Sequence, residues 1–364
     1  MSRGRFLILG ACLLAIPVAG IVVACTSAVR PALREVPGSV GMPVVEAEDD
    51  AFTVVFIGDP EARMRGNTAS ELGGYVDQLL NVKDDPRHRW RLDDGRTLPI
   101  EPELVIIGGD ISSDRSTSID ADLPIWQPIL DQGVPVLAGF GNHDWEPESW
   151  GDSPSYSFAG HRSNESTIAF TRETYRRSAK VSPELSYREI GPTSDHGPVT
   201  FLATYKGVDI VNFNTFLYQP SYRYPDGWPI TCNPLGGGAG CQEFVGAEPQ
   251  IAEMDSLLGE SRERPAIFTQ HYPLSTGDRW WSDYGSTETS LADRKERLLG
   301  LMAERKDVVF LAGHNHRASA REWTVGDRRI PEHVAPYFGD GGGFIAVRIS
   351  PTRGVLAVRN IEFN

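Results

Sequence analysis

The sequence predicts a mixed α/β fold in which strands alternate with helices. Five short apolar runs rich in Val, Ile and Phe recur after residue 51, and most are followed by a loop that carries Gly or His. Helical patterns separate several of these runs, an alternation typical of a largely parallel sheet covered on both faces. Two further β-rich segments are expected to add antiparallel strands to this core.

The apolar runs are expected to be buried strands, because their length and β-branched content fit strands better than helices. They are FTVVFIGD (52–59), ELVIIGGD (103–110), VPVLAGFGNHD (134–144), AIFTQH (266–271) and VVFLAGH (308–314). Helices are predicted over 68–82, 122–132, 248–259 and 290–305.

The remaining segments are hairpins and loops. Residues 199–214 hold two β-rich runs joined at Lys206-Gly207, which predicts a hairpin, and 342–360 predict another strand pair. The stretches 146–195 and 219–246 are rich in Pro, Gly, Ser and aromatic residues, so we expect long loops over the site.

Residues 1–24 have the layout of a secretory signal peptide. Arg3 and Arg5 precede an apolar run without acidic residues. The run ends in VVAC, which resembles a bacterial lipobox, and this resemblance implies that Cys25 is lipidated. The alternative is an uncleaved membrane helix, because the stretch from Phe6 is just long enough to span a bilayer. Both predict an exported protein; the first predicts a cell-envelope lipoprotein, on the periplasmic or cell-surface side.

The predicted export indicates the chemical state of the remaining cysteines. Cys12 would be lost with the signal peptide, which leaves Cys232 and Cys241 at the ends of CNPLGGGAGC. A Gly-rich loop closed by two cysteines in an oxidising compartment predicts a disulfide. Two metal-binding thiolates are the alternative, although a second pair of ligands is missing from this stretch.

Composition and charge indicate the domain organisation and the classes of ligand that the protein could bind. Residues 25–50 combine Pro, Gly and the acidic run EAEDD, which predicts a flexible tether before a globular domain at 51–364. The formal net charge of −14 argues against a surface that binds nucleic acid, since phosphate contacts need clustered Lys and Arg. It does not exclude a small anionic substrate attracted by local cations such as metal ions.

Polar side chains follow each of the five apolar runs where the predicted strand ends. In open α/β sheets, ligands bind outside the carboxyl ends of strands, so these side chains are expected to meet in one crevice. Taken singly, each histidine could be a core or surface residue, Asp110 a turn residue and Asn142 a cap. As a set, carboxylate, amide and imidazole groups favour divalent metals such as Mn, Fe or Zn. The set is Asp59, Glu61, Asp110, Asn142, His143, Asp144, His271, His314 and His316.

The order GDPE, GGD, GNHD, QHYP and GHNH resembles the sequence blocks of the calcineurin-like metallophosphoesterase family. The resemblance covers roughly residues 52–318 and implies a two-sheet sandwich of mixed β-sheets flanked by helices. It also implies two divalent metal ions bridged by Asp110. Asp59 and His316 would bind the first ion, and Asn142, His271 and His314 the second.

His143 would face the substrate rather than a metal, with Asp144 as its orienting partner. One block departs from the family pattern, because Glu61 stands where the family has histidine. A glutamate can bind a divalent metal through oxygen, which would make the first position harder and more anionic. Arg63 is a weaker candidate for contact with substrate phosphate, since a lone Arg after a strand is more often a surface residue.

The resemblance implies hydrolysis of a phosphate ester. By the same resemblance, two metals about 3.5–4 Å apart would lower the pKa of a shared water toward about 7, and the resulting hydroxide would attack phosphorus. We expect a phosphomonoesterase, in which His143 stabilises the leaving alkoxide. A phosphodiesterase on the same scaffold is one alternative. The other is a catalytically weak protein that binds phosphate or metal, in which Glu61 marks lost catalysis.

Overall fold

The structure is a computed structural model. It describes residues 44–45, 48–62, 69–112, 119–141, 144, 156–190, 200–213, 247–274 and 288–363, with side chains omitted at 44–45, 156–166, 247–252 and 288–294. Several predictions lie outside the described residues. These are the signal peptide at 1–24, most of the tether at 25–50, the loop at 219–246, and the residues Cys25, Arg63, Asn142, His143, Cys232 and Cys241.

A five-stranded sheet contains the first three predicted strands. Its order is β15-β14-β2-β5-β6. Strands β2, β5 and β6 run parallel, whereas β14 is antiparallel to both of its neighbours. The strands are β2 (Phe52–Ile57), β5 (Leu104–Ile107), β6 (Val136–Ala138), β14 (Phe344–Ser350) and β15 (Gly354–Ile361).

A seven-stranded sheet contains the other two predicted strands. Its order is β12-β13-β11-β10-β9-β8-β7, with β13, β11, β10 and β9 parallel and antiparallel strands at both edges. The strands are β7 (Ser186–Ile190), β8 (Thr200–Tyr205), β9 (Val208–Phe213), β10 (Ala266–Gln270), β11 (Val308–Ala312), β12 (Ser319–Val325) and β13 (Arg328–Val334). A third, small sheet consists of β1 (Val44–Val45), β3 (Arg89–Leu92) and β4 (Thr97–Pro99).

Alternate residues of β2 show how the layers pack. Val54 and Phe56 enter a buried core shared with strands of the seven-stranded sheet. Val55 and Ile57 point the other way and pack with α1 (Ala69–Asn81) and α2 (Ile119–Asp131). The two sheets are therefore the inner layers of a sandwich, which confirms the predicted fold class.

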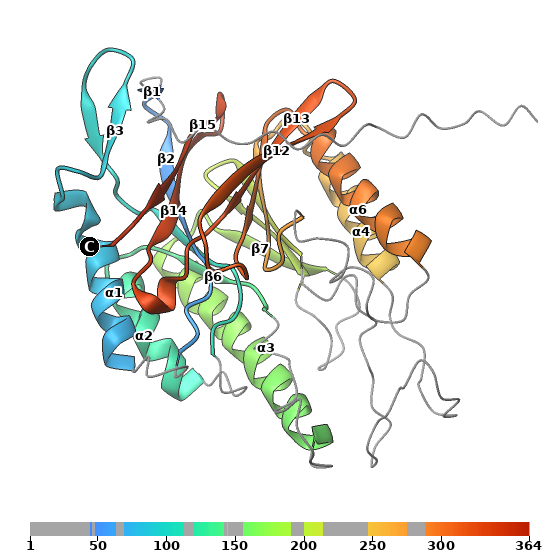
Figure 1. The fold of residues 1–364 in the computed structure, drawn as a ribbon, viewed down its shortest axis with the longest axis horizontal. Coiled ribbons are helices and arrows are strands. Elements are labelled where there is room, and N and C mark those ends of the chain that lie inside the picture. The colour runs from blue at the N-terminus through green and yellow to red at the C-terminus, as the bar shows by residue number, and fades with distance from the viewer. Residues whose placement is uncertain are drawn as a thin grey trace, which may run out of the picture. The chain divides into compact units, whose positions relative to one another are not determined.

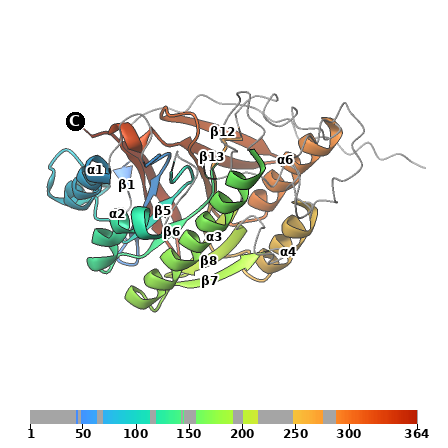
Figure 2. The ribbon, with the colours of Figure 1, turned by 90° about the horizontal axis from the view of Figure 1, so that it is seen from below.

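The outer layers are helical (Figure 1). A third core joins the far face of the seven-stranded sheet to α4 (Ala247–Gly259) and α6 (Glu288–Ala303). Figure 2 shows α1 and α2 on one side of the molecule and α4 and α6 on the other. All four helices were predicted, with ends shifted by a few residues. None of the described helices is long and apolar enough to cross a bilayer.

The hairpin prediction is confirmed at Lys206-Gly207. Strands β8 and β9 pair in antiparallel register, and both turn residues have positive φ, 47° and 78°. That is the backbone of a two-residue type I′ turn, in which glycine carries no steric cost at the second position.

Two predictions about the architecture were wrong. The five strands do not share one largely parallel sheet, since β10 and β11 belong to the second sheet. The stretch 146–195 is not all loop, because it contains the helix α3 (Tyr156–Val181) and β7. In α3, the hydroxyl of Ser178 donates to the Val136 carbonyl and accepts from the Val136 N–H, at 2.7 Å each. Helix α3 thus covers the edge strand β6, where a loop was expected.

Candidate metal centre

The carboxyl ends of both sheets meet at one place. Nδ1 of His271, after β10, lies 3.1 Å from the Gly108 carbonyl, after β5. The Gly313 N–H after β11 donates to the His271 carbonyl at 3.0 Å. The loop after β13 closes the group, because the N–H groups of Phe338 and Gly339 donate to the carbonyls of residues 58 and 59 after β2. Strand ends from two sheets therefore converge on one crevice, as expected from the sequence.

Three carboxylates are buried in this crevice. Asp59 is 0 % exposed, and Glu61 and Asp110 are 1 % exposed. Both carboxylate oxygens of Asp59 accept the backbone N–H of His314 at 2.8 Å. The loop after β11 thus fixes the Asp59 carboxylate as it presents its own histidines.

A first group of donor atoms surrounds Asp110. Single ligand atoms of Asp110, His271 and His314 all lie within 4.8 Å of one another. Nε2 of His271 is 2.9 Å from Oδ2 of Asp110. A carbonyl can only accept, so Nδ1 of His271 is the donor to Gly108, and this bond turns Nε2 toward the carboxylates. Such an outer bond is what orients a metal-binding histidine.

A second group lies beside the first. Nε2 of His316 is 3.5 Å from Oδ1 of Asp59 and 3.4 Å from Oε1 of Glu61. The hydroxyl of Tyr337 donates to Oε2 of Glu61 at 2.6 Å. The Tyr337 ring is stacked on the His316 imidazole, with 4.3 Å between centroids and 8° between planes. The two groups adjoin, since Oδ1 of Asp59 is 3.7 Å from Nε2 of His271.

The backbone is strained where these side chains are attached. Among the described residues, six that are not glycine have positive φ, and all but the hairpin residue Lys206 carry a candidate ligand. Such conformations are uncommon outside glycine and gather at functional sites, where the surrounding structure enforces them. The five are Asp59, Glu61, Asp110, His314 and His316, with φ of 51°, 40°, 50°, 69° and 55°.

Close approach of two loops explains a glycine in GNHD. A Cβ on Gly141 would lie 2.0 Å from Oδ1 of Asp110, so only glycine fits there. Asp144, fully buried three residues later, accepts the N–H groups of Gly141, Ile111 and Ser112. Asp144 therefore ties the loop after β6 to the loop after β5. Its expected contact with His143 falls outside the described residues.

The pKa shifts of the buried side chains indicate that this crevice requires positive charge. Burial raises the pKa of Asp59, and burial together with the charge of Asp110 raises that of Asp144 to about 7. Burial by itself lowers the pKa of His271, but the carboxylates of Asp110 and Asp59 outweigh it and raise the pKa to about 9. Hydrogen bonds to Asp59 and Glu61 raise the pKa of His316 to about 10. Protons on these groups offset a buried negative charge that divalent cations would offset instead, so the donor set fits metal binding.

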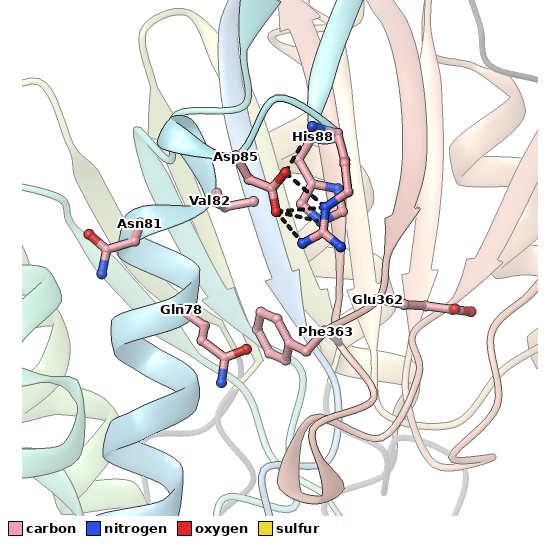
Figure 3. A pocket seen from close by; sticks show the side chains of 8 residues that line it. Gln78, Asn81, Val82, Asp85, His88, Glu362 and Phe363 are labelled. Carbon is pink, nitrogen blue, oxygen red and sulfur yellow. Dashed lines mark hydrogen bonds and ion pairs between the residues drawn. The ribbon is translucent and has the colours of Figure 1, made fainter.

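A pocket elsewhere in the chain lacks this chemistry. It lies between the end of α1 and the C-terminal segment (Figure 3) and is lined by Gln78, Asn81, Val82, Asp85, Arg87, His88, Glu362 and Phe363. Its carboxylate at Asp85 accepts Nε and Nη2 of Arg87 as well as the backbone N–H of that residue. The carboxylate of Asp85 is thus paired with Arg87, and none of the described candidate ligands is among the residues that line this pocket.

Comparison with family models decides the classification. The model described as calcineurin-like phosphoesterase matches residues 52–335. The chain belongs to this family. The protein is therefore a metallophosphoesterase, an enzyme that hydrolyses phosphate esters with the help of divalent metals.

The solved structures that match this phosphoesterase have low sequence identity to it. One is GAP50, the anchor in the inner membrane complex of Plasmodium (13 % identity, 87 % of this chain and 90 % of that chain covered, TM-score 0.41). Another is the phosphopantetheinyl hydrolase of Mycobacterium tuberculosis (16 %, 82 % and 91 %, 0.37). A third is the 5′-nucleotidase precursor of Thermus thermophilus (11 %, 86 % and 55 %, 0.35). Comparison with curated protein sequences gives no significant match.

The structure brings together six of the residues predicted from the sequence: Asp59, Glu61, Asp110, His271, His314 and His316. Asn142, His143 and Arg63 lie outside the described residues. The sequence reasoning missed Tyr337. The signal that could have found it is the rule used for the other strands, because β13 runs parallel to β11 and ends at the same edge. Residues 328–334 were not recognised as a strand, so the tyrosine after them was not considered.

Proposed function

We propose that this phosphoesterase is a phosphomonoesterase with two divalent metal ions. Asp59, Glu61 and His316 would hold one ion. His271, His314 and Asn142 would hold the other, with Asp110 between the two. The observation that supports the two metal ions is the arrangement of the donor atoms in two adjoining groups, one around Asp110 and one around His316. A donor set of carboxylates, imidazoles and an amide suits Mn, Fe or Zn.

When bound, two divalent ions supply a positive potential that acidifies water and stabilises charge on phosphate oxygens. The residues of the chain determine where this potential acts. Asp59 is held by the His314 N–H, and His271 by the Gly108 carbonyl, so both donors are aligned in advance. His143 would donate a proton to the leaving alkoxide.

A panel of esters tests this function. Chelator-stripped protein reloaded with Mn²⁺ or Zn²⁺ should hydrolyse p-nitrophenyl phosphate and an alkyl phosphate faster than bis-p-nitrophenyl phosphate.

His143→Ala should keep its metal and lose at least about 10²-fold in turnover on the alkyl phosphate, with a smaller loss on p-nitrophenyl phosphate. The reason is that an alkoxide needs a proton more than p-nitrophenolate does. His88→Ala, in the pocket of Figure 3, is the matched control and should leave turnover unchanged.

Each alternative has its own outcome in this panel. Preferred hydrolysis of the bis ester would identify a phosphodiesterase. Metal binding without hydrolysis of any ester would identify the catalytically weak binding protein. Equal losses on both monoesters in His143→Ala, or loss of its metal, would contradict the role of leaving-group acid.

We also propose that the protein is exported and held at the membrane through a lipid on Cys25, with Cys232 and Cys241 joined in a disulfide. The support is the basic and apolar N-terminal segment that ends in VVAC, and the Gly-rich loop between the two later cysteines. A loop of that size contributes about 3 kcal/mol in the chain-entropy model.

One mass-spectrometry experiment on protein expressed in a bacterium tests both points. The mature chain in the membrane fraction should begin at a lipidated Cys25 and contain no free thiol at Cys232 and Cys241. Cys25→Ala should release the protein or leave it unprocessed, whereas Cys12→Ala should change neither outcome. Recovery of an unmodified Cys25 would exclude the lipid anchor, and two free thiols would exclude the disulfide.

A further inference from the structure

Tyr337 contacts the second group of donors, although it lies outside the region matched by the family model, which ends at residue 335. It follows β13 and pairs with Gly58 in an isolated parallel bridge. The next two residues donate their N–H groups to the carbonyls of Gly58 and Asp59, both at 3.1 Å. The backbone of Tyr337 is therefore fixed to the same loop that carries Asp59 and Glu61.

The side chain of Tyr337 makes two contacts within this group. Its hydroxyl donates to Oε2 of Glu61 at 2.6 Å, a short bond of the charge-assisted kind. Its ring lies flat on the imidazole of His316. One side chain thus restrains both a carboxylate and an imidazole of the proposed first metal site.

The bond also divides the two oxygens of Glu61 between different tasks. Oε2 accepts from Tyr337, whereas Oε1 lies 3.4 Å from Nε2 of His316. Oε1 therefore faces the other donors, so a metal held by this group would meet one oxygen of the carboxylate rather than two. A glutamate has more freely rotating bonds than a histidine, so holding it in one rotamer lowers the entropy lost when a metal binds.

We propose that Tyr337 is a positioning residue that makes Glu61 a one-oxygen ligand and sets the affinity of the first metal site. The pair of Glu61 and Tyr337 would thereby serve where the resemblance to the family expects a histidine. This inference rests on the proposed dinuclear function. With Asp59, Glu61 and Asp110 contributing oxygen and His316 one nitrogen, the site would take a harder ion such as Mn²⁺ in preference to Zn²⁺.

Calorimetric titration of the chelator-stripped full chain with Mn²⁺ tests the inference. Tyr337→Phe removes the hydroxyl and keeps the ring on His316, so one of two sites should lose about 10- to 100-fold in affinity, the usual effect of removing an outer partner of a ligand. The other site should keep its affinity. Excess Mn²⁺ should restore turnover to within about threefold of the wild type, a rescue that a general folding defect would not allow.

Two further variants isolate the contact. Tyr187→Phe is the matched control, because its buried hydroxyl makes no hydrogen bond in the described part of the chain, and it should bind Mn²⁺ like the wild type. In a Glu61→Ala background the acceptor is gone, so adding Tyr337→Phe should weaken binding no further.

The outcomes separate this inference from the proposed function. Wild-type Mn²⁺ affinity at both sites in Tyr337→Phe would overturn the inference, whether or not esters are hydrolysed. Weaker Mn²⁺ binding at one site of Tyr337→Phe, in a protein whose wild type hydrolyses no monoester, would support the positioning role of Tyr337. It would overturn the proposed phosphomonoesterase function. Failure of the wild type to bind Mn²⁺ would overturn the inference, and failure to bind Mn²⁺, Fe²⁺ and Zn²⁺ alike would overturn both.

Discussion

Asp110→Asn should lower turnover on p-nitrophenyl phosphate by on the order of 10³-fold or more at every metal concentration. Asp110 is 1 % exposed, and its Oδ2 is 2.9 Å from Nε2 of His271. It lies in the group with His271 and His314, and the proposal gives it a contact to both metals. Asparagine keeps the shape of the side chain but loses the charge, so neither ion would be held in place. Bound metal, measured in the same protein, should fall below two ions per chain.

The loss should not come from unfolding. Removing the charge of Asp110 relieves its repulsion of Asp144. It also removes the main cause of the raised pKa of His271, so that imidazole can lose its proton and no uncompensated charge remains in the metal-free protein. Asp50→Asn is the matched control, because Asp50 accepts the hydroxyls of Ser350 and Thr352 away from the metal centre and should leave turnover unchanged. Turnover of Asp110→Asn within about tenfold of the wild type would contradict a bridging role.

The strand ends explain why so much of the site could be predicted. Parallel strands of one sheet end at one edge, and each apolar run marks its own end by a change to Gly, Asp or His. This local signal located Asp59, Asp110, His271 and His314. It could not indicate that the strands belong to two sheets, because sheet membership depends on contacts far apart in the sequence.

Helix α3 was missed for a physical reason. Part of its buried face is made of hydroxyl residues at helical spacing rather than of apolar residues: Thr167, Thr171, Thr174 and Ser178. Thr171 and Thr174 donate to carbonyls four residues earlier in the same helix, and Ser178 bonds to β6. A search for apolar periodicity treats such a face as polar and therefore predicts a loop.

Tyr337 illustrates a different limit. The identity of Glu61 showed that the first block departs from the family, but it did not show what compensates for the change. The partner lies 276 positions later in the chain. Only the pairing of β13 with β11, together with the bridge between Tyr337 and Gly58, brings the two residues together.

The buried charges at the other end of the seven-stranded sheet serve stability instead. Asp209, at the start of β9, and Arg305, after α6, are 0 % and 1 % exposed. Nη2 of Arg305 donates to Oδ2 of Asp209 at 2.6 Å and to the Arg264 carbonyl at 3.1 Å, and Nη1 donates to the Leu258 carbonyl at 3.0 Å. Ser261 donates to the same oxygen of Asp209 at 2.7 Å. The network ties the ends of α4 and α6 to the sheet, at the strand ends opposite to the metal centre.

Arg305→Ala should therefore destabilise the fold without altering the chemistry. Removing the buried partner leaves the Asp209 carboxylate with only the half-exposed guanidinium of Arg264. Loss of a buried partner of this kind costs about 3–5 kcal/mol of unfolding free energy. Urea denaturation of the metal-free protein measures the loss, and kcat of the fraction that remains folded should be unchanged. Arg264→Ala is the matched control. Its guanidinium also contacts Asp209, at 3.1 Å, but the side chain is 46 % exposed, so its removal should cost at most about 1 kcal/mol. Equal losses in the two variants would show that burial of Arg305 adds nothing to the pair, and a lowered kcat in Arg305→Ala would show that the network reaches the metal centre.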